Sequence, residues 1–159
     1  PGAVVSPFSW EGSSIRVELG PDERLFLPSL MVLLATVGQR VEDPAAERLD
    51  PPAYEEDEGA DAEYRRLIAG ELEAARTTDR DRFAATIGAD QLSRDDAESW
   101  LRVLGDARLA LAARKGIVRD EDGWEEGIGD DPELGMLAYL GFLQGSLVEA
   151  LTAGLETTA

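Results

Sequence analysis

Residues 93–116 read SRDDAESWLRVLGDARLALAARKG, and this stretch contains the clearest helix in the 159-residue chain. Ser93 stands three residues before Asp96, which resembles the capping box that begins a helix. Gly116 is a natural stop at the other end. Apolar side chains recur at helical spacing on one face, namely Trp100, Leu104, Ala107 and Leu111. The stretch therefore predicts a helix with one face in a core.

Similar patterns on either side predict further helices. Pro21-Asp22-Glu23 places proline and acids where a first helical turn favours them, so a helix should run to about Arg40, bent or restarted at Pro28. A helix over 60–77 and a short helical piece over 80–87 should follow. Asp131-Pro132 should begin the last helix, whose apolar residues recur at helical spacing: Met136, Leu140, Leu143, Leu147 and Leu151.

The N-terminal region has the pattern of a strand. Ile15, Val17 and Leu19 alternate with polar residues, which is typical of a half-buried strand. The cluster at 12–14, Gly-Ser-Ser, could turn the chain back towards residues 3–5. We expect a small antiparallel hairpin here.

These elements together predict a mainly α fold, a compact helical bundle of about four to five helices with a small N-terminal β hairpin. A chain of this length suits one domain, with a strand region at 1–20 and a helical body at 21–155 of residues 1–159. The apolar run Leu25–Gly38 is too short for a membrane span. No secretory leader is recognised at the start, so we expect a cytoplasmic protein.

The net charge of −18 is concentrated in two segments. Residues 42–63 carry ten acids and one base, and residues 119–133 carry eight acids and one base, which leaves the rest of the chain almost neutral. The carboxylates within each segment repel one another, so both segments should form acidic loops. Because nucleic-acid backbones are also anionic, direct binding to nucleic acid is not expected.

The chain contains no cysteine and no histidine. Disulfides, thiol switches, thiolate nucleophiles, histidine-based triads and His- or Cys-ligated metal sites are therefore excluded. No phosphate-binding loop, dinucleotide fingerprint or nucleophile elbow is present either. We predict a protein that is not an enzyme and that has no cofactor and no metal site.

The acidic run at 55–58, with Asp61 and Glu63, leaves one alternative open. Carboxylates can hold Mg²⁺ or Ca²⁺ and could support a divalent-metal enzyme. A hydrated acidic loop is the favoured interpretation, because charge runs usually stay solvated.

Arg108 lies beside the apolar face of the 93–116 helix and needs a partner there. It could pair with a carboxylate of the loop around 54–63, which would make the motif residues mostly scaffold. Alternatively, Arg108, Arg48 and Arg65 could converge on a pocket for an anion.

The Glu63-Tyr64-Arg65-Arg66 region is locally basic, but its charges are mixed, which does not indicate a basic groove. Gly141 and Gly145 would let another helix approach, within the fold or across a homodimer.

Three segments resemble an actinobacterial family of unknown function whose members are labelled AosR-type oxidative-stress transcriptional regulators. The segments are 47–54 (ERLDPPAY) with the following 62–67 (AEYRRL), 100–111 (WLRVLGDARLAL) and 139–148 (YLGFLQGSLV). The motif residues in them, and in the acids between 54 and 62, are Arg48, Tyr54, Asp57, Glu63, Tyr64, Arg65, Arg66, Trp100, Asp106 and Arg108. Gly105 stands where the family has Asn before Asp106, so the contacts of that amide are lost.

The resemblance implies a transcription-related role through protein contact, with a sigma factor as the expected partner. It also implies a gene neighbourhood shared with the Clp-protease adaptor. Family members sense oxidation through cysteines, which this chain does not have, so a thiol switch cannot operate here.

Three hypotheses follow for the function. The first is a non-enzymatic regulator or adaptor that presents acidic loops and an exposed helix face to a protein, a sigma factor or the transcription machinery. The second is an accessory of Clp-type regulated proteolysis, and the third is the carboxylate-based metal enzyme.

Overall fold

The computed structural model describes residues 5–49, 58–117 and 123–158. Within these ranges the chain forms β1 (Phe8–Glu11), β2 (Ser14–Val17), α1 (Pro21–Ala35), α2 (Pro44–Leu49), α3 (Glu58–Thr86), β3 (Gln91–Leu92), α4 (Arg94–Arg114), the 3₁₀ helix η1 (Trp124–Gly127) and α5 (Pro132–Thr158). The mainly α fold with a small N-terminal β element is confirmed.

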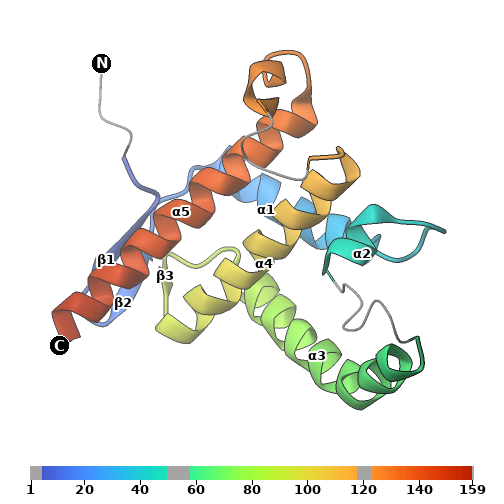
Figure 1. Cartoon of the computed structure of the whole chain (residues 1–159). Helices are drawn as coiled ribbons and strands as arrows, with labels where there is room; N and C mark the ends of the chain where they lie inside the picture. Colours follow the sequence, from blue (N-terminus) through green and yellow to red (C-terminus); the bar gives the residue numbers. More distant parts are fainter. Residues whose placement is uncertain (1–4, 50–57, 118–122, 159) are drawn as a thin grey trace.

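Helix α4 occupies the centre of the molecule. It contacts α5 on one side and α3 and α2 on the other, and it also touches α1, β2 and β3 (Figure 1). Ser93 Oγ accepts from the Asp96 backbone N–H at 3.1 Å, and Gly116 follows the helix with a φ of +74°. Both predicted ends of this helix are thus confirmed, because the signals for them are local.

The hydrophobic core surrounds α4 and contains apolar side chains from the helices and strands that contact it. Trp100, fully buried, makes edge contacts with Phe8 and Phe83, at 6.1 and 4.9 Å between ring centroids. Its indole N–H donates to Thr86 Oγ1 at 2.6 Å. The remaining core includes Ile15, Leu27, Leu30, Leu92, Leu104, Leu140, Leu143 and Leu147.

The N-terminal hairpin is extended by a third strand. In the antiparallel sheet β1-β2-β3, Trp10 pairs with Ile15 and Ile15 with Leu92. The turn at Gly12, with a φ of +67°, is where the sequence predicts it. The predicted pairing with residues 3–5 is wrong. A two-residue turn pairs the residues directly on either side of it, so β2 pairs with β1. Val5 is 74% exposed, and Ala3 and Val4 lie outside the described residues.

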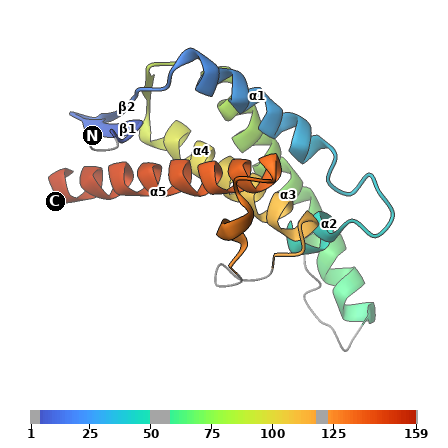
Figure 2. The ribbon, with the colours of Figure 1, turned by 90° about the horizontal axis from the view of Figure 1, so that it is seen from above.

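Helix α5 runs past the sheet as well as past α4, and β1 contacts it (Figure 2). Gly154 makes this possible, because a Cβ there would lie 2.6 Å from carbons of the Trp10 ring. In the part of the chain that is described, Pro132–Thr157 of α5 is the one helix long and apolar enough to cross a membrane. A core helix passes the same test, and Leu137, Leu140 and Leu143 are buried in the core.

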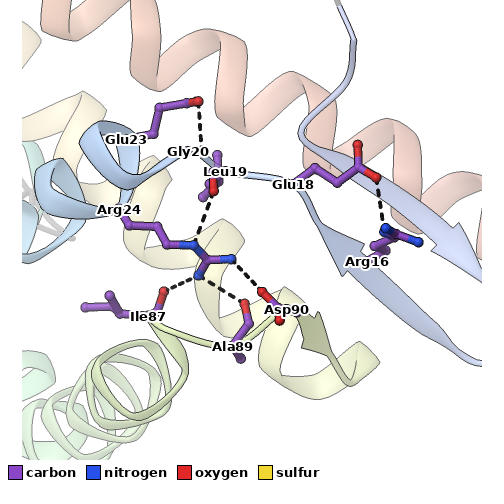
Figure 3. Close-up of polar contacts among 9 residues, drawn as sticks. All are labelled: Arg16, Glu18, Leu19, Gly20, Glu23, Arg24, Ile87, Ala89 and Asp90. Carbon is purple, nitrogen blue, oxygen red and sulfur yellow. Dashed lines mark hydrogen bonds and ion pairs between the residues drawn. The ribbon is translucent and has the colours of Figure 1, made fainter.

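Helix α1 and the turn before β3 are joined by one side chain, Arg24 (Figure 3). Its Nη1 donates to the carbonyl oxygens of Ile87 at 2.8 Å and Ala89 at 3.1 Å, and its Nε donates to that of Leu19 at 3.3 Å. Nη2 pairs with Asp90 at 3.1 Å. The guanidinium thereby fixes the chain between α3 and β3 against the start of α1.

Several predicted boundaries differ from the structure. Helix α1 continues through Pro28 without a restart and ends at Ala35 instead of near Arg40, where Thr36 Oγ1 donates to the Leu33 carbonyl and Gly38 follows with a φ of +82°. The two pieces predicted at 60–77 and 80–87 are a single helix, α3. No proline or glycine interrupts 71–86, and Thr78 Oγ1 satisfies the Ala74 carbonyl at 2.9 Å.

The two acidic segments are not entirely loops. Helix α2 lies inside the first and η1 inside the second, while residues 50–57 and 118–122 are outside the described ranges. Asp43 accounts for α2, since its Oδ1 accepts from the Ala45 N–H at 3.1 Å at the start of the helix.

Candidate functional site

The motif residues of α4 point in different directions. Trp100 belongs to the core described above and is therefore a structural residue. Asp106 faces α3, where the positive charges of Arg76 and Arg80 lie nearby. Arg108 faces α5, where its Nη1 donates to Gln144 Oε1 at 3.4 Å and its Nε would lie 3.7 Å from a Cβ on Gly141. The motif thus supports contacts to two neighbouring helices.

The segments 100–111 and 139–148 meet at the contact between α4 and α5. Gly105 is the counterpart of Gly141 there, because a Cβ at Gly105 would lie 3.2 Å from Gln144 Nε2. The small-residue stripe of α5 is thus used inside the fold at Gly141. A role of Gly145 in a homodimer stays a prediction.

Two ion pairs fasten α4 to its other neighbours. Arg114 donates to both carboxylate oxygens of Asp43, from Nη2 at 2.8 Å and from Nε at 3.2 Å, and both residues are largely buried. Hydrogen bonds from Arg114, together with the N–H groups of Gly38 and Ala45, hold the pKa of Asp43 well below its usual range despite burial, which acts in the opposite direction. Arg102 makes a second two-pronged pair with Asp79, at 2.8 and 2.9 Å.

The other motif residues lie on or beside α2 and α3. Arg48, Glu63, Tyr64 and Arg66 have exposed side chains, and Arg66 Nε donates to the Ala62 carbonyl of its own helix at 3.4 Å. Arg65 lies in α3, and nothing further is described for its side chain. Tyr54 and Asp57 lie outside the described residues, so the expected pairing of Arg108 with the 54–63 loop stays a prediction.

The outer part of α3 projects from the body in both views (Figures 1 and 2). We call residues 58–75 the α3 arm. None of its side chains that are described is buried, whereas α4 buries eight residues. The arm nevertheless carries apolar side chains at helical spacing, with Tyr64 41%, Leu67 73% and Leu72 40% exposed, and Ile68 between them.

A cavity of about 550 Å³ lies at the base of the arm, between α3, α2 and the end of α1. Two arginines one helical turn apart, Arg76 and Arg80, line it together with Glu47 and Glu73. Arg76 Nη2 donates to the Leu49 carbonyl at 2.6 Å. Arg48 and Arg108, which the sequence suggested for an anion pocket, do not line this cavity.

Two charged groups at the base of the arm, Arg80 and Asp106, lie in surroundings that do not fully compensate them. Arg80 Nε is shielded from solvent and makes no hydrogen bond within the described part of the chain. Burial raises the pKa of the nearby Asp106 carboxyl above its usual value, although Arg76 and Arg80 act in the opposite direction. In the sequence, Arg76 and Arg80 belong to the locally basic region that begins at Glu63-Tyr64-Arg65-Arg66, and their i, i+4 spacing places them on one face of a helix, but no pattern indicates that they line a cavity.

In residues 5–49, 58–117 and 123–158, no three carboxylates lie close enough together to hold a metal ion. Most of the acidic run proposed for such a site falls within residues 50–57, outside those ranges. The arm and the cavity at its base are two surface features of the described residues that a partner could contact.

Comparison with known proteins gives one match. A family model described as a domain of unknown function (DUF2017) covers residues 5–151. No curated protein and no solved structure matches the chain.

Proposed function

The chain belongs to DUF2017, a family of unknown function, and on that premise we propose that it is a non-enzymatic regulator or adaptor that acts by binding another protein. The observation that carries the proposal is the α3 arm. In proteins, most helical stability comes from packing of an apolar face against another element, which the arm does not have among its described side chains. An exposed helix that bears an apolar stripe supplies the anchors of helix-in-groove recognition.

The stripe lies among charged residues that indicate the chemistry of the partner. Glu63, Glu71 and Glu73 are exposed on the arm, and the whole chain is strongly anionic. A matching partner offers an apolar groove bordered by basic side chains. Opposite charges would speed encounter and make it sensitive to salt.

The resemblance to AosR-type regulators suggests a sigma factor, or another component of the transcription machinery, as this partner. The chain would act there without a thiol switch, since it contains no cysteine. Contact with the partner, and not a change in its own oxidation state, would carry the regulation.

Binding to purified sigma factors and core RNA polymerase from the same cell tests the proposal, measured by calorimetry at low and high salt. We expect binding that weakens with salt, and a loss of about tenfold or more with Leu67→Glu, because an exposed apolar anchor is replaced by a charge. Leu25→Glu is the matched control, since Leu25 is 76% exposed on α1, away from the arm.

Two results would overturn the proposal. If none of these purified proteins binds at either salt concentration, the transcriptional partner is wrong. If Leu67→Glu binds as tightly as the unchanged chain, or no more weakly than Leu25→Glu, the arm is not the contact surface.

A further inference from the structure

The cavity at the base of the α3 arm has one apolar wall and one charged wall. Its apolar side comes from the end of α1 and from α2, with Leu34, Ala35, Val37, Ala46 and Leu49. Its charged side comes mainly from α3. At about 550 Å³ it falls within the size range of small-molecule sites.

The charged groups of this cavity are not satisfied by one another. Arg76 is engaged with the Leu49 carbonyl, whereas Arg80 has a shielded Nε with no hydrogen bond in the described chain. Glu47 and Glu73 also line the cavity, and neither makes an ion pair within the described ranges. Because Arg80 Nε is shielded from solvent, a ligand in the cavity would reach the guanidinium through its terminal nitrogens, where an acceptor oxygen would be stabilising.

We infer that this cavity binds a small zwitterion, a free α-amino acid with an apolar side chain. Its carboxylate accepts from Arg80, since guanidinium and carboxylate match in geometry and charge. Its ammonium group lies towards Glu47 and Glu73, and its side chain packs on Leu34, Val37 and Leu49. A simple anion would be repelled by the two glutamates, which is why a zwitterion fits better than a carboxylate alone.

Apart from Glu73, which belongs to the arm and also lines the cavity, the site is separate from the proposed protein contact. The contact uses the outer turns of α3 around Leu67, whereas the ligand uses the turns at its base. Failure of one proposal therefore leaves the other standing, because Leu67→Glu leaves every lining residue unchanged.

Calorimetric titration of the whole chain with L-leucine, up to about 10 mM, tests the inference, since that concentration nearly saturates a site with a dissociation constant of about 1 mM. Two comparison ligands each lack one charge: 4-methylpentanoate has no ammonium group, and 3-methylbutylamine has no carboxylate. We expect saturable binding of L-leucine, and binding of both comparison ligands about tenfold weaker or more. No saturable binding of L-leucine, or equal binding of 4-methylpentanoate, would refute a zwitterion site.

Variants then locate the site. Arg80→Gln should weaken L-leucine binding about tenfold or more, because a charge-assisted hydrogen bond is lost. Arg82→Gln, an exposed arginine of the same helix that does not line the cavity, should bind as the unchanged chain does. Glu73→Gln removes an exposed carboxylate without disturbing the core, and should weaken L-leucine binding but not that of 4-methylpentanoate. Unchanged affinity in both Arg80→Gln and Glu73→Gln, or equal loss in Arg82→Gln, would place the ligand elsewhere.

Discussion

Helix α4 and the α3 arm differ in what surrounds them, although both are parts of long helices. Every neighbour of α4 is another element of the fold, and eight of its residues are buried. The α3 arm has no buried side chain among those described, although it belongs to a helix of 29 residues, about 43 Å long.

The difference between α4 and the α3 arm distinguishes residues that stabilise the fold from exposed residues that are available to contact a partner. Trp100, Asp106 and Arg108 look like a functional motif in the sequence, yet Trp100 lies in the core, and Asp106 and Arg108 face neighbouring helices of the fold. Leu67, at the end of the 62–67 motif segment, and Leu72, which belongs to no motif, are exposed. Membership of a conspicuous sequence motif therefore does not by itself separate structural residues from the contact surface in this molecule.

The largest expected effect is at the centre of α4. Trp100→Ala should lower the free energy of unfolding by about 3–5 kcal/mol, because it removes a fully buried ring and leaves a cavity. Urea denaturation followed by far-UV circular dichroism measures this loss. A change below about 1 kcal/mol would mean that α4 is not the centre of the core.

A smaller effect should appear where α4 is fastened to the start of α2. Asp43→Asn should lower Tm by about 5 °C or more at neutral pH, because it leaves buried Arg114 without its charged partner. The pKa of Asp43 is lowered in the folded chain, so its contribution is present above its unfolded pKa of about 3.8 and is lost as the pH falls below it.

The difference in Tm between Asp43→Asn and the unchanged chain should therefore narrow below about pH 4. Asp90→Asn is the matched control, since Asp90 pairs with Arg24 but its side chain is 91% exposed. Equal decreases in Tm for Asp43→Asn and Asp90→Asn would contradict the conclusion that Asp43 makes a buried ion pair that stabilises the fold.

The smallest effect should be on the α3 arm. Leu67→Ala should change the free energy of unfolding by no more than about 0.5 kcal/mol, because its side chain is 73% exposed and alanine favours the helix. The same urea titration compares it directly with Trp100→Ala. A loss above about 2 kcal/mol would show that the arm is packed within the fold, and would remove the contrast on which the proposed function rests.

The sequence predicted α4 and α5 well because their signals are local. A cap and an apolar period define each of them, and α4 also has a stop at Gly116. The region between α1 and α3 was predicted less well, since its acids indicated a loop. Helix α2 forms there because Asp43 is neutralised by Arg114, 71 residues away in the chain, which no local pattern reveals.

The same reasoning applies to the third strand and to the cavity. Strand β3 has two residues, and it exists because Ile15 and Arg16 pair with it and Arg24 holds the preceding turn. Arg76 and Arg80 meet α2 and the end of α1 only after the chain has folded. What sequence patterns missed, in each instance, depends on contacts between distant parts of the chain.

The hydroxyl of Tyr139 donates to Glu23 Oε2 at 2.5 Å, joining the last helix to the beginning of the first. Beside this bond Phe26 packs edge-on against Tyr139, and further along α5 the ring of Trp10 meets Gly154. During synthesis on the ribosome, the β1–β2 hairpin and α1 must therefore wait for α5 before their apolar faces are covered. Such distant contacts slow folding, and they make the emerging chain dependent on its own C-terminal helix for protection against aggregation.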